Sequence, residues 1–277
     1  MSHRINSLIV SDKIVPSNEK RLSICLVSNG FSFSVTTCKD ELFALGEVEI
    51  NWAGNATMTA TMGAIKAAFN EAGIQPFGFN VVELVVPSRQ FVWVPQHLYD
   101  AANDRKYLEA LCKISVGNSV YADFNETLNA YMVFAADSNL VSAFKIAIPG
   151  IKVRCQHSKL LNAALMEQSA SRSLLVMNLR DGAVDFAVLC NKKLMISNTY
   201  ECANVDEALY HGVNLSKQFH LEDAALTMVV CGNVDRQSYE YISRFFPSTA
   251  LYSGRPLSLL NPDMCQCPLY RYALMLA

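Results

Sequence analysis

The sequence predicts an α/β fold built from two related halves, and three observations support this prediction. A strand–turn–strand passage occurs twice, at residues 22–35 and 174–188, about 150 residues apart. Each copy places Asn-Gly or Asp-Gly between two apolar runs, which favours a tight hairpin because the turn requires positive φ. Similar elements follow both hairpins in the same order, and a repeated unit of this size indicates two half-domains related by internal duplication.

Composition restricts the class of partner. The chain has 277 residues, of which 51% are hydrophobic and 17% are charged, so its surface carries few charges for its size. A well-buried core is the simpler explanation, although an apolar contact patch also fits. The 23 basic and 25 acidic residues give a net charge of −2, and the basic residues are scattered. Because no basic stripe exists to neutralise a phosphate backbone, we expect no nucleic-acid partner.

The cysteines and the N-terminus predict the compartment. The nine cysteines are dispersed, odd in number and without a Cys-x-x-Cys pair, which favours small core residues in a reducing compartment. Residues 1–20 are polar and lack the apolar stretch of a signal peptide, so we expect them to form an N-terminal arm. No apolar run is long enough to span a bilayer. The sequence therefore predicts a cytoplasmic protein without membrane insertion.

Hydrophobic periodicity predicts the order of elements. After the first hairpin we expect strands at 43–50, 80–87, 91–94, 131–135 and 152–155, and helices at 62–73, 98–111, 138–148 and 159–168. After the second hairpin we expect strands at 194–199, 225–231 and near 250, helices starting after Asn204 and containing 239–246, and a docked tail at 264–277. Glu207 completes a capping box with Asn204. These boundaries predict an arm at 1–20, a first half-domain at 21–157 and a second at 158–277.

This order, ββ-β-α-β-α-β in each half, resembles the actin-like ATPase superfamily, whose half-domains are ribonuclease H-like mixed sheets with flanking helices. The likeness is closest to the pilus-assembly (PilM-like) branch and to an uncharacterised bacterial family with that fold. The run from Met132 to Ser138, continuing through Pro149-Gly150 to Ser158, is similar to the crossover between the halves in that branch. The resemblance covers residues 20 to 277 as an order of elements.

The resemblance implies a ligand cleft between the two hairpin turns. In the superfamily each turn carries Asp two positions before its glycine, and these carboxylates organise the metal. Here Ser28 and Arg180 occupy those positions, while Asp181 lies one position off and on the opposite face of the strand. One glycine of the family's adenosine motif remains, at Gly232. The implied cleft residues are Ser28, Asn29, Gly30, Arg180, Asp181, Gly182, Gly232 and Asn233, with no catalytic residue and no metal ligand among them.

Two charged side chains leave alternatives open. Glu83 interrupts an apolar strand, and an outward-facing glutamate is a simpler interpretation than a buried base with a raised pKa. Arg180 is expected to be a solvated turn residue facing Asp181 or Asp185, and the alternative is an anion-binding residue.

The pattern of histidines, and of one serine, predicts neither a metal site nor a catalytic nucleophile. His211 and His220 would lie roughly 180° apart on one continuous helix, so they cannot share a metal. His97 and His157 are each near an expected helix start, where exposure or a local hydrogen bond is the default. Ser119 follows Gly117-Asn118 but lacks the second glycine of a nucleophile elbow, so we interpret it as a loop residue.

Two hypotheses of different classes follow. The first is a non-catalytic actin-like protein that works as an interaction or scaffold module, with a protein partner or self-association and no cofactor. The alternative is a nucleotide-dependent ATPase or small-molecule kinase that binds ATP through atypical turns, resting on Gly30, Gly182 and Gly232. A third option is a cleft that binds another anion through Arg180 and backbone amides.

Overall fold

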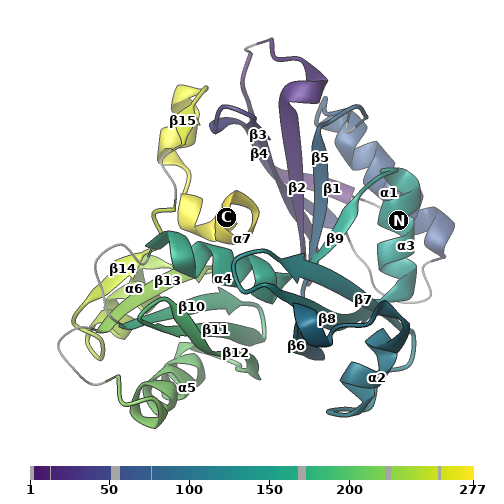
Figure 1. Ribbon diagram of the computed structural model, residues 1–277. Helices are drawn as coiled ribbons and strands as arrows, with labels where there is room; N and C mark the ends of the chain where they lie inside the picture. Colours follow the sequence, from purple (N-terminus) through teal and green to yellow (C-terminus); the bar gives the residue numbers. More distant parts are fainter. Residues whose placement is uncertain are drawn as a thin grey trace. The chain divides into compact units, whose positions relative to one another are not determined.

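The computed structural model describes residues 3–12, 14–50, 57–75, 77–167, 173–221, 226–254 and 257–277. The chain divides into two compact units. Met1–Ser158 and Leu257–Gln266 form the first unit, and Lys159–Pro256 and Cys267–Ala277 form the second. The C-terminal segment, yellow in Figure 1, therefore contributes residues to both units, a feature that the sequence analysis did not predict.

The first unit contains most of the strands. Its elements are β1 (His3–Val10), η1 (Ser17–Glu19), β2 (Lys20–Val27), β3 (Gly30–Thr37), β4 (Glu41–Ile50), α1 (Met58–Glu71), β5 (Val81–Val86), β6 (Phe91–Pro95), η2 (Gln96–Leu98), η3 (Ala101–Asn103), α2 (Asp104–Glu109), β7 (Asn118–Asn125), β8 (Ala130–Asp137), α3 (Ser138–Ala147), β9 (Lys152–Cys155), β15 (Ser258–Leu259) and η4 (Pro262–Gln266). Helix α4 (Gln156–Glu167) begins in the first unit and continues into the second.

The main sheet of the first unit has the order β1-β4-β3-β2-β5-β9, and β15 also pairs with β4. The predicted hairpin forms, with Leu22 opposite Val35 and Val27 opposite Gly30. Strands β5 and β9 run parallel to the hairpin's first strand, which explains why β5 is almost entirely apolar. Helices α1 and α3 contribute to the same core, where Phe31 stacks against Phe69 at a ring distance of 5.3 Å.

Two predictions about the N-terminal half were wrong. Residues 3–10 form strand β1, not a free arm, because apolar side chains such as Ile5 and Leu8 pack on the core beside β4. The expected helix at 98–111 is divided into η2, η3 and α2. The division occurs where the Asp100 carboxylate accepts a hydrogen bond from the Ala102 N–H and caps a new turn.

A second, three-stranded sheet of the first unit has the order β6-β8-β7. Strand β7 includes Ser119, so the interpretation of this serine as a loop residue was wrong. Ser119 pairs with Ala136, and the register continues to Asn125 opposite Ala130. Cross-strand pairing along β8, which no local signal in the sequence reveals, stabilises β7 as a strand.

The second unit repeats the central topology. Besides α4 it contains β10 (Ser173–Arg180), β11 (Ala183–Cys190), β12 (Lys193–Glu201), α5 (Val205–Gln218), β13 (Leu226–Gly232), α6 (Arg236–Ser243), β14 (Thr249–Leu251), η5 (Leu269–Tyr272) and α7 (Ala273–Leu276). Its sheet order β12-β11-β10-β13-β14 matches β4-β3-β2-β5-β9 in the first unit, including the antiparallel hairpin and the two parallel strands. This equivalence of the two sheets supports an internal duplication, which remains a prediction.

Local signals place the helices of the second unit. Asn204 caps α5 by accepting from the Glu207 N–H, as predicted, and the Glu207 carboxylate accepts from the Ala203 N–H at 2.8 Å. The tail also docks, with Leu274 and Met275 buried. None of the helices in the described part of the chain combines the length and apolar character that a membrane crossing requires.

Candidate functional site

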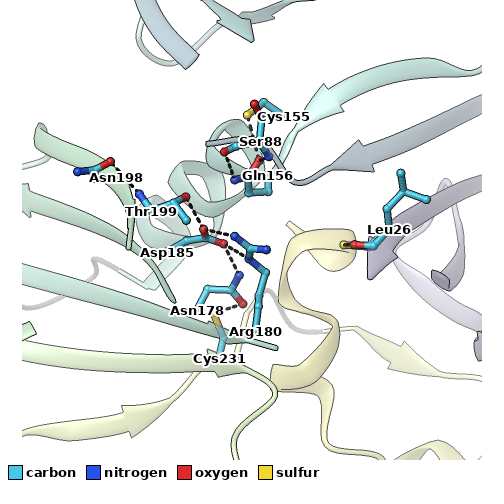
Figure 2. A network of polar contacts seen from close by, with 11 residues as sticks. Leu26, Ser88, Cys155, Gln156, Asn178, Arg180, Asp185, Asn198, Thr199 and Cys231 are labelled. Carbon is cyan, nitrogen blue, oxygen red and sulfur yellow. Dashed lines mark hydrogen bonds and ion pairs between the residues drawn. The ribbon is translucent and has the colours of Figure 1, made fainter. Parts of the chain in front are cut away.

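A partly buried ion pair lies beside the second hairpin turn. Asp185 of β11 is 0% exposed, and Arg180, the last residue of β10, reaches it with two hydrogen bonds. Arg180 Nε donates to Oδ2 and Nη2 donates to Oδ1, each at 2.7 Å (Figure 2). A bidentate guanidinium–carboxylate contact is among the strongest polar contacts in proteins. Arg180 therefore faces Asp185, one of the two expected partners, but it belongs to strand β10 and its side chain is only 24% exposed, so its interpretation as a solvated turn residue was wrong.

Strand register builds a polar row around this pair. Thr199 lies opposite Asp185, Asp185 opposite Asn178, and Asn178 opposite Cys231, so the four residues cross four strands in line. Thr199 Oγ1 donates to Asp185 Oδ1 at 2.7 Å, and Asn178 Nδ2 donates to Oδ2 at 2.9 Å (Figure 2). The Cys231 thiol, whose pKa is raised by burial, contacts Asn178 Oδ1 at 3.6 Å. Both carboxylate oxygens of Asp185 are therefore already engaged.

A second polar chain joins the turn to the end of β13. Asn233 Nδ2 donates to Asp181 Oδ1 at 2.9 Å, and Arg271 Nη2 donates to Asn233 Oδ1 at 2.8 Å. Glycine at position 232 lets the backbone of β13 lie close to the backbone of β10, because a Cβ there would be 2.2 Å from the Leu179 carbonyl oxygen. Its φ of +82° also favours glycine.

The glycine of the second turn has a different environment. Gly182 has φ +71°, and an added Cβ would meet no atom within 4 Å. The backbone beside Gly182 is therefore open on that side. Arg180, Asp181, Gly182, Gly232 and Asn233 thus lie together at one end of the second sheet, where β10 and β13 end.

The first hairpin turn is closed by its neighbouring strand. Ser28 and Asn29 are exposed, and the Asn29 carbonyl accepts from the Ile50 N–H at 2.8 Å. A Cβ on Gly30 would lie 2.0 Å from the Val48 carbonyl oxygen, so glycine is required by the close approach of β4. These three predicted residues belong to the first unit, and their role as one cleft with the five residues of the second unit stays a prediction.

A charged cluster links both sheets of the first unit. Arg154 of β9 donates from Nε to Glu83 of β5 at 3.1 Å and from Nη1 to Asp123 of β7. The Glu83 side chain is 14% exposed, so the preferred interpretation of Glu83 as outward-facing was wrong. Glu83 lies on an interior strand, and Arg154 supplies its counter-charge. Burial raises the pKa of Asp123, while the neighbouring Arg154 acts in the opposite direction.

The residues after Arg154 hold the strand connections together. The Cys155 N–H donates to Asp123 Oδ2 at 3.3 Å. The Gln156 amide contacts both backbone groups of Ser88, accepting from its N–H at 2.8 Å and donating to its carbonyl at 2.7 Å (Figure 2). The geometry of this cluster is that of a structural junction between β5, β7, β9 and α4.

The structure contradicts the expectation for one histidine, His157, which was expected to be exposed or to form a local hydrogen bond. His157 is fully buried and packs on Phe91 at a ring distance of 4.0 Å, because α4 begins at Gln156, earlier than predicted. His97 is exposed, as expected. His220 lies beyond the end of α5, with φ +53°, so it does not share a helix with His211. Within the described ranges, no group of three or more His, Cys, Asp or Glu side chains is arranged to hold a metal ion.

Several residues of both clusters were missed by sequence reasoning. Asp123 and Arg154 gave no signal, because nothing in the sequence pairs β7 with β9. Asn178 and Asp185 did give one, since Asp185 is the lone polar residue of β11 and Asn178 interrupts the apolar run 174–179 of β10. A polar residue at a fully buried strand position predicts a buried partner.

Comparison with known proteins identifies the fold and the family. A family model described as "Protein of unknown function (DUF3822)" matches residues 11–248. A Bacteroides thetaiotaomicron protein with actin-like ATPase fold and unknown function superposes with a TM-score of 0.72 at 18% identity, over 94% of this chain and 97% of that one. A search of curated proteins by sequence finds no significant match.

Two further structures share the fold at lower similarity. The PilM–PilN type IV pilus biogenesis complex gives a TM-score of 0.55 at 12% identity, over 94% of this chain and 97% of that one. The ethanolamine utilization protein EutJ from Carboxydothermus hydrogenoformans gives 0.52 at 10% identity, over 97% and 93%. The predicted α/β class and actin-like fold are confirmed. The family match covers most of the chain, and the protein therefore belongs to the DUF3822 family.

Proposed function

We propose that this protein is a non-catalytic member of the actin-like ATPase fold that acts as an interaction or scaffold module. One observation carries the proposal, namely the Arg180–Asp185 pair at the second hairpin turn. Arg180 occupies the position at which the superfamily resemblance implies a metal-organising carboxylate. Arg180 places a guanidinium, neutralised by Asp185, where that chemistry requires a carboxylate that is available to the metal.

The contacts of Asp185 support the same proposal. Asp185 is a poor substitute for the implied carboxylate, because its oxygens already accept from Arg180, Asn178 and Thr199. A magnesium ion bridging phosphates is normally oriented by carboxylates and their bound waters. The pair therefore disfavours magnesium nucleotide at this turn.

The first turn supports the same proposal. Phe31 follows Gly30, where the superfamily usually carries glycine or a small hydroxyl residue. The Phe31 ring is 1% exposed and packs edge-on against Phe144 at 5.6 Å. The position is therefore used for the core of the first unit.

The interaction role has separate support. The similar PilM structure is of a complex with PilN. All nine cysteines lie in the described part of the chain and none of them forms a disulfide, which is consistent with the cytoplasm as the proposed compartment.

A magnesium-ATP titration followed by thermal unfolding tests the proposal. A ligand at a hundred times its dissociation constant adds about 2.7 kcal/mol of stability. We expect millimolar ATP to leave the unfolding temperature unchanged with or without magnesium. Magnesium-dependent stabilisation that is lost in Gly182→Val would instead support the alternative, a nucleotide-dependent ATPase or small-molecule kinase. This alternative rests on the three glycines Gly30, Gly182 and Gly232.

A further inference from the structure

We propose that the outer edge of strand β6 pairs with the same edge of a second copy of this chain, forming a two-fold symmetric dimer. Strand β6 (Phe91–Pro95) stands at one end of the order β6-β8-β7, so among the described residues it has a strand neighbour on one side only. The inference deepens the proposed interaction function by naming the surface and its occupant, and it rests on that function.

The hydrogen bonds to β8 show which backbone groups of β6 point outward. The Ala135 N–H donates to the Gln90 carbonyl at 2.9 Å, and the Gln96 N–H donates to the Asn129 carbonyl at 3.0 Å. Because hydrogen-bonded pairs alternate along an antiparallel ladder, even-numbered residues bond to β8 and residues 91, 93 and 95 face away from it. The outer edge therefore offers three carbonyls but only two N–H groups, since Pro95 has none.

Other edges of the described sheets carry features that oppose pairing with another chain. Strand β1 has a bulge in its pairing with β4, and the Asn261 side chain donates to its Val10 carbonyl. Strand β12 has a bulge in its pairing with β11, and its Thr199 N–H donates to the Asn198 side chain. Bulges and charged residues are common protections of edge strands. Strand β6 has an unbroken register with β8 and contains no charged residue.

Strand β6 is complementary to itself when two copies run antiparallel. In the register that pairs all five residues, Trp93 lies opposite the partner's Trp93, and Phe91 lies opposite the partner's Pro95. The Trp93 N–H then donates to the partner's Trp93 carbonyl, and the Phe91 N–H donates to the partner's Pro95 carbonyl. All four outward N–H groups of the two copies have an acceptor, and position 95 is required only to accept. No like charges oppose each other in this register.

The residues that flank β6 favour a second copy as the occupant. At the first end, Gln90 donates from Nε2 to the Lys113 carbonyl at 2.6 Å and accepts from the Ser115 N–H at 3.1 Å, and the next residue, Val116, is fully exposed. Beyond the other end, Leu98 is 62% exposed. A two-fold antiparallel contact places the first end of one copy beside the last end of the other. The exposed apolar side chains of the two copies then approach each other.

The test measures the oligomeric state and the edge amides of the full chain together. Because the contact is small, we expect a monomer–dimer equilibrium with a dissociation constant between about 1 μM and 1 mM by sedimentation. In the monomer the amides of residues 91 and 93 should exchange rapidly, whereas those of residues 92 and 94 are bonded to β8. When nine-tenths of the chains are dimeric, residues 91 and 93 should exchange about tenfold more slowly, because exchange occurs from the remaining monomer.

Pro95→Ala tests the register of the pair. Alanine supplies the missing N–H, which in this register donates to the partner's Phe91 carbonyl and adds two hydrogen bonds to the dimer. We expect the dissociation constant to fall by about tenfold. Pro149→Ala is the matched control, because Pro149 is also an exposed proline of the first unit but lies outside β6. It should leave the dissociation constant unchanged.

Four results overturn the inference. They are a chain that stays monomeric at about 1 mM, a dimer in which residues 91 and 93 exchange as in the monomer, protection of these two amides at every concentration, and equal effects of Pro95→Ala and Pro149→Ala. The wild-type exchange data decide the question even if a variant folds poorly. The magnesium-ATP titration tests the proposed function independently. Loss of the dimer without nucleotide binding rejects only this surface, whereas magnesium-dependent stabilisation rejects the non-catalytic role.

Discussion

Replacing Arg180 with methionine removes the guanidinium while keeping an unbranched stem of similar length. Asp185 then stays 0% exposed without its counter-charge, and it retains the hydrogen bonds from Asn178 and Thr199. Removing one partner of a buried ion pair lowers the free energy of unfolding by about 3–5 kcal/mol. Because Asn178 and Thr199 still donate to Asp185, we expect a loss near the lower end of this range, about 3 kcal/mol. We expect this loss of stability to be measurable in the second unit, which contains both residues.

Hydrogen exchange of the amides in β10 and β11 measures this loss locally. A destabilisation of about 3 kcal/mol corresponds to exchange that is faster by roughly a hundredfold, if these amides exchange by cooperative opening. Arg236→Met is the matched control, because it removes an arginine from an exposed i,i+4 pair with Glu240. We expect no resolvable change in exchange for this control.

A second substitution separates charge from packing. Asp185→Asn in the Arg180→Met background removes the unpaired charge and keeps an oxygen that accepts from Thr199 or Asn178. Exchange in the double variant should therefore be slower than in Arg180→Met alone, as a double-mutant cycle would record. The reasoning is refuted if Arg180→Met exchanges like Arg236→Met, or if Asp185→Asn gives no rescue.

Two further predictions concern the turns and the first unit. Gly30→Ala should lower the unfolding temperature more than Gly182→Ala, because only the first forces a Cβ to 2.0 Å from the Val48 carbonyl oxygen. Gly182→Ala meets only the strain of a positive φ, about 1 kcal/mol, so equal shifts would contradict this reasoning. Arg154→Met should speed hydrogen exchange in β7 and β9 by leaving Glu83 and Asp123 without a shared counter-charge. Exchange indistinguishable from that of Arg105→Met, which breaks an exposed pair, would argue against this role.

Features encoded within a few residues were predictable. Both hairpins follow from Asn29-Gly30 and Asp181-Gly182 between apolar runs, and the start of α5 follows from Asn204. The strands β5 and β13 follow from unbroken apolar runs, which identify strands covered on both faces. Strand β7 had no such signal, since its pairing with β8 is a relation between segments.

The sequence by itself determined the α/β class, the two hairpins and the presence of Ser28 and Arg180 beside the two turns, because turn chemistry and residue identity are local properties. Only the tertiary structure decided which residue Arg180 contacts. Asp185 becomes the partner of Arg180 because strand register places it beside Asn178 and Thr199 in a buried row, where a charge requires a counter-charge. Likewise, Glu83 meets Arg154 and Asp123 only because β5, β9 and β7 converge in space. Burial and register join residues distant in the chain, and a single sequence does not contain that information.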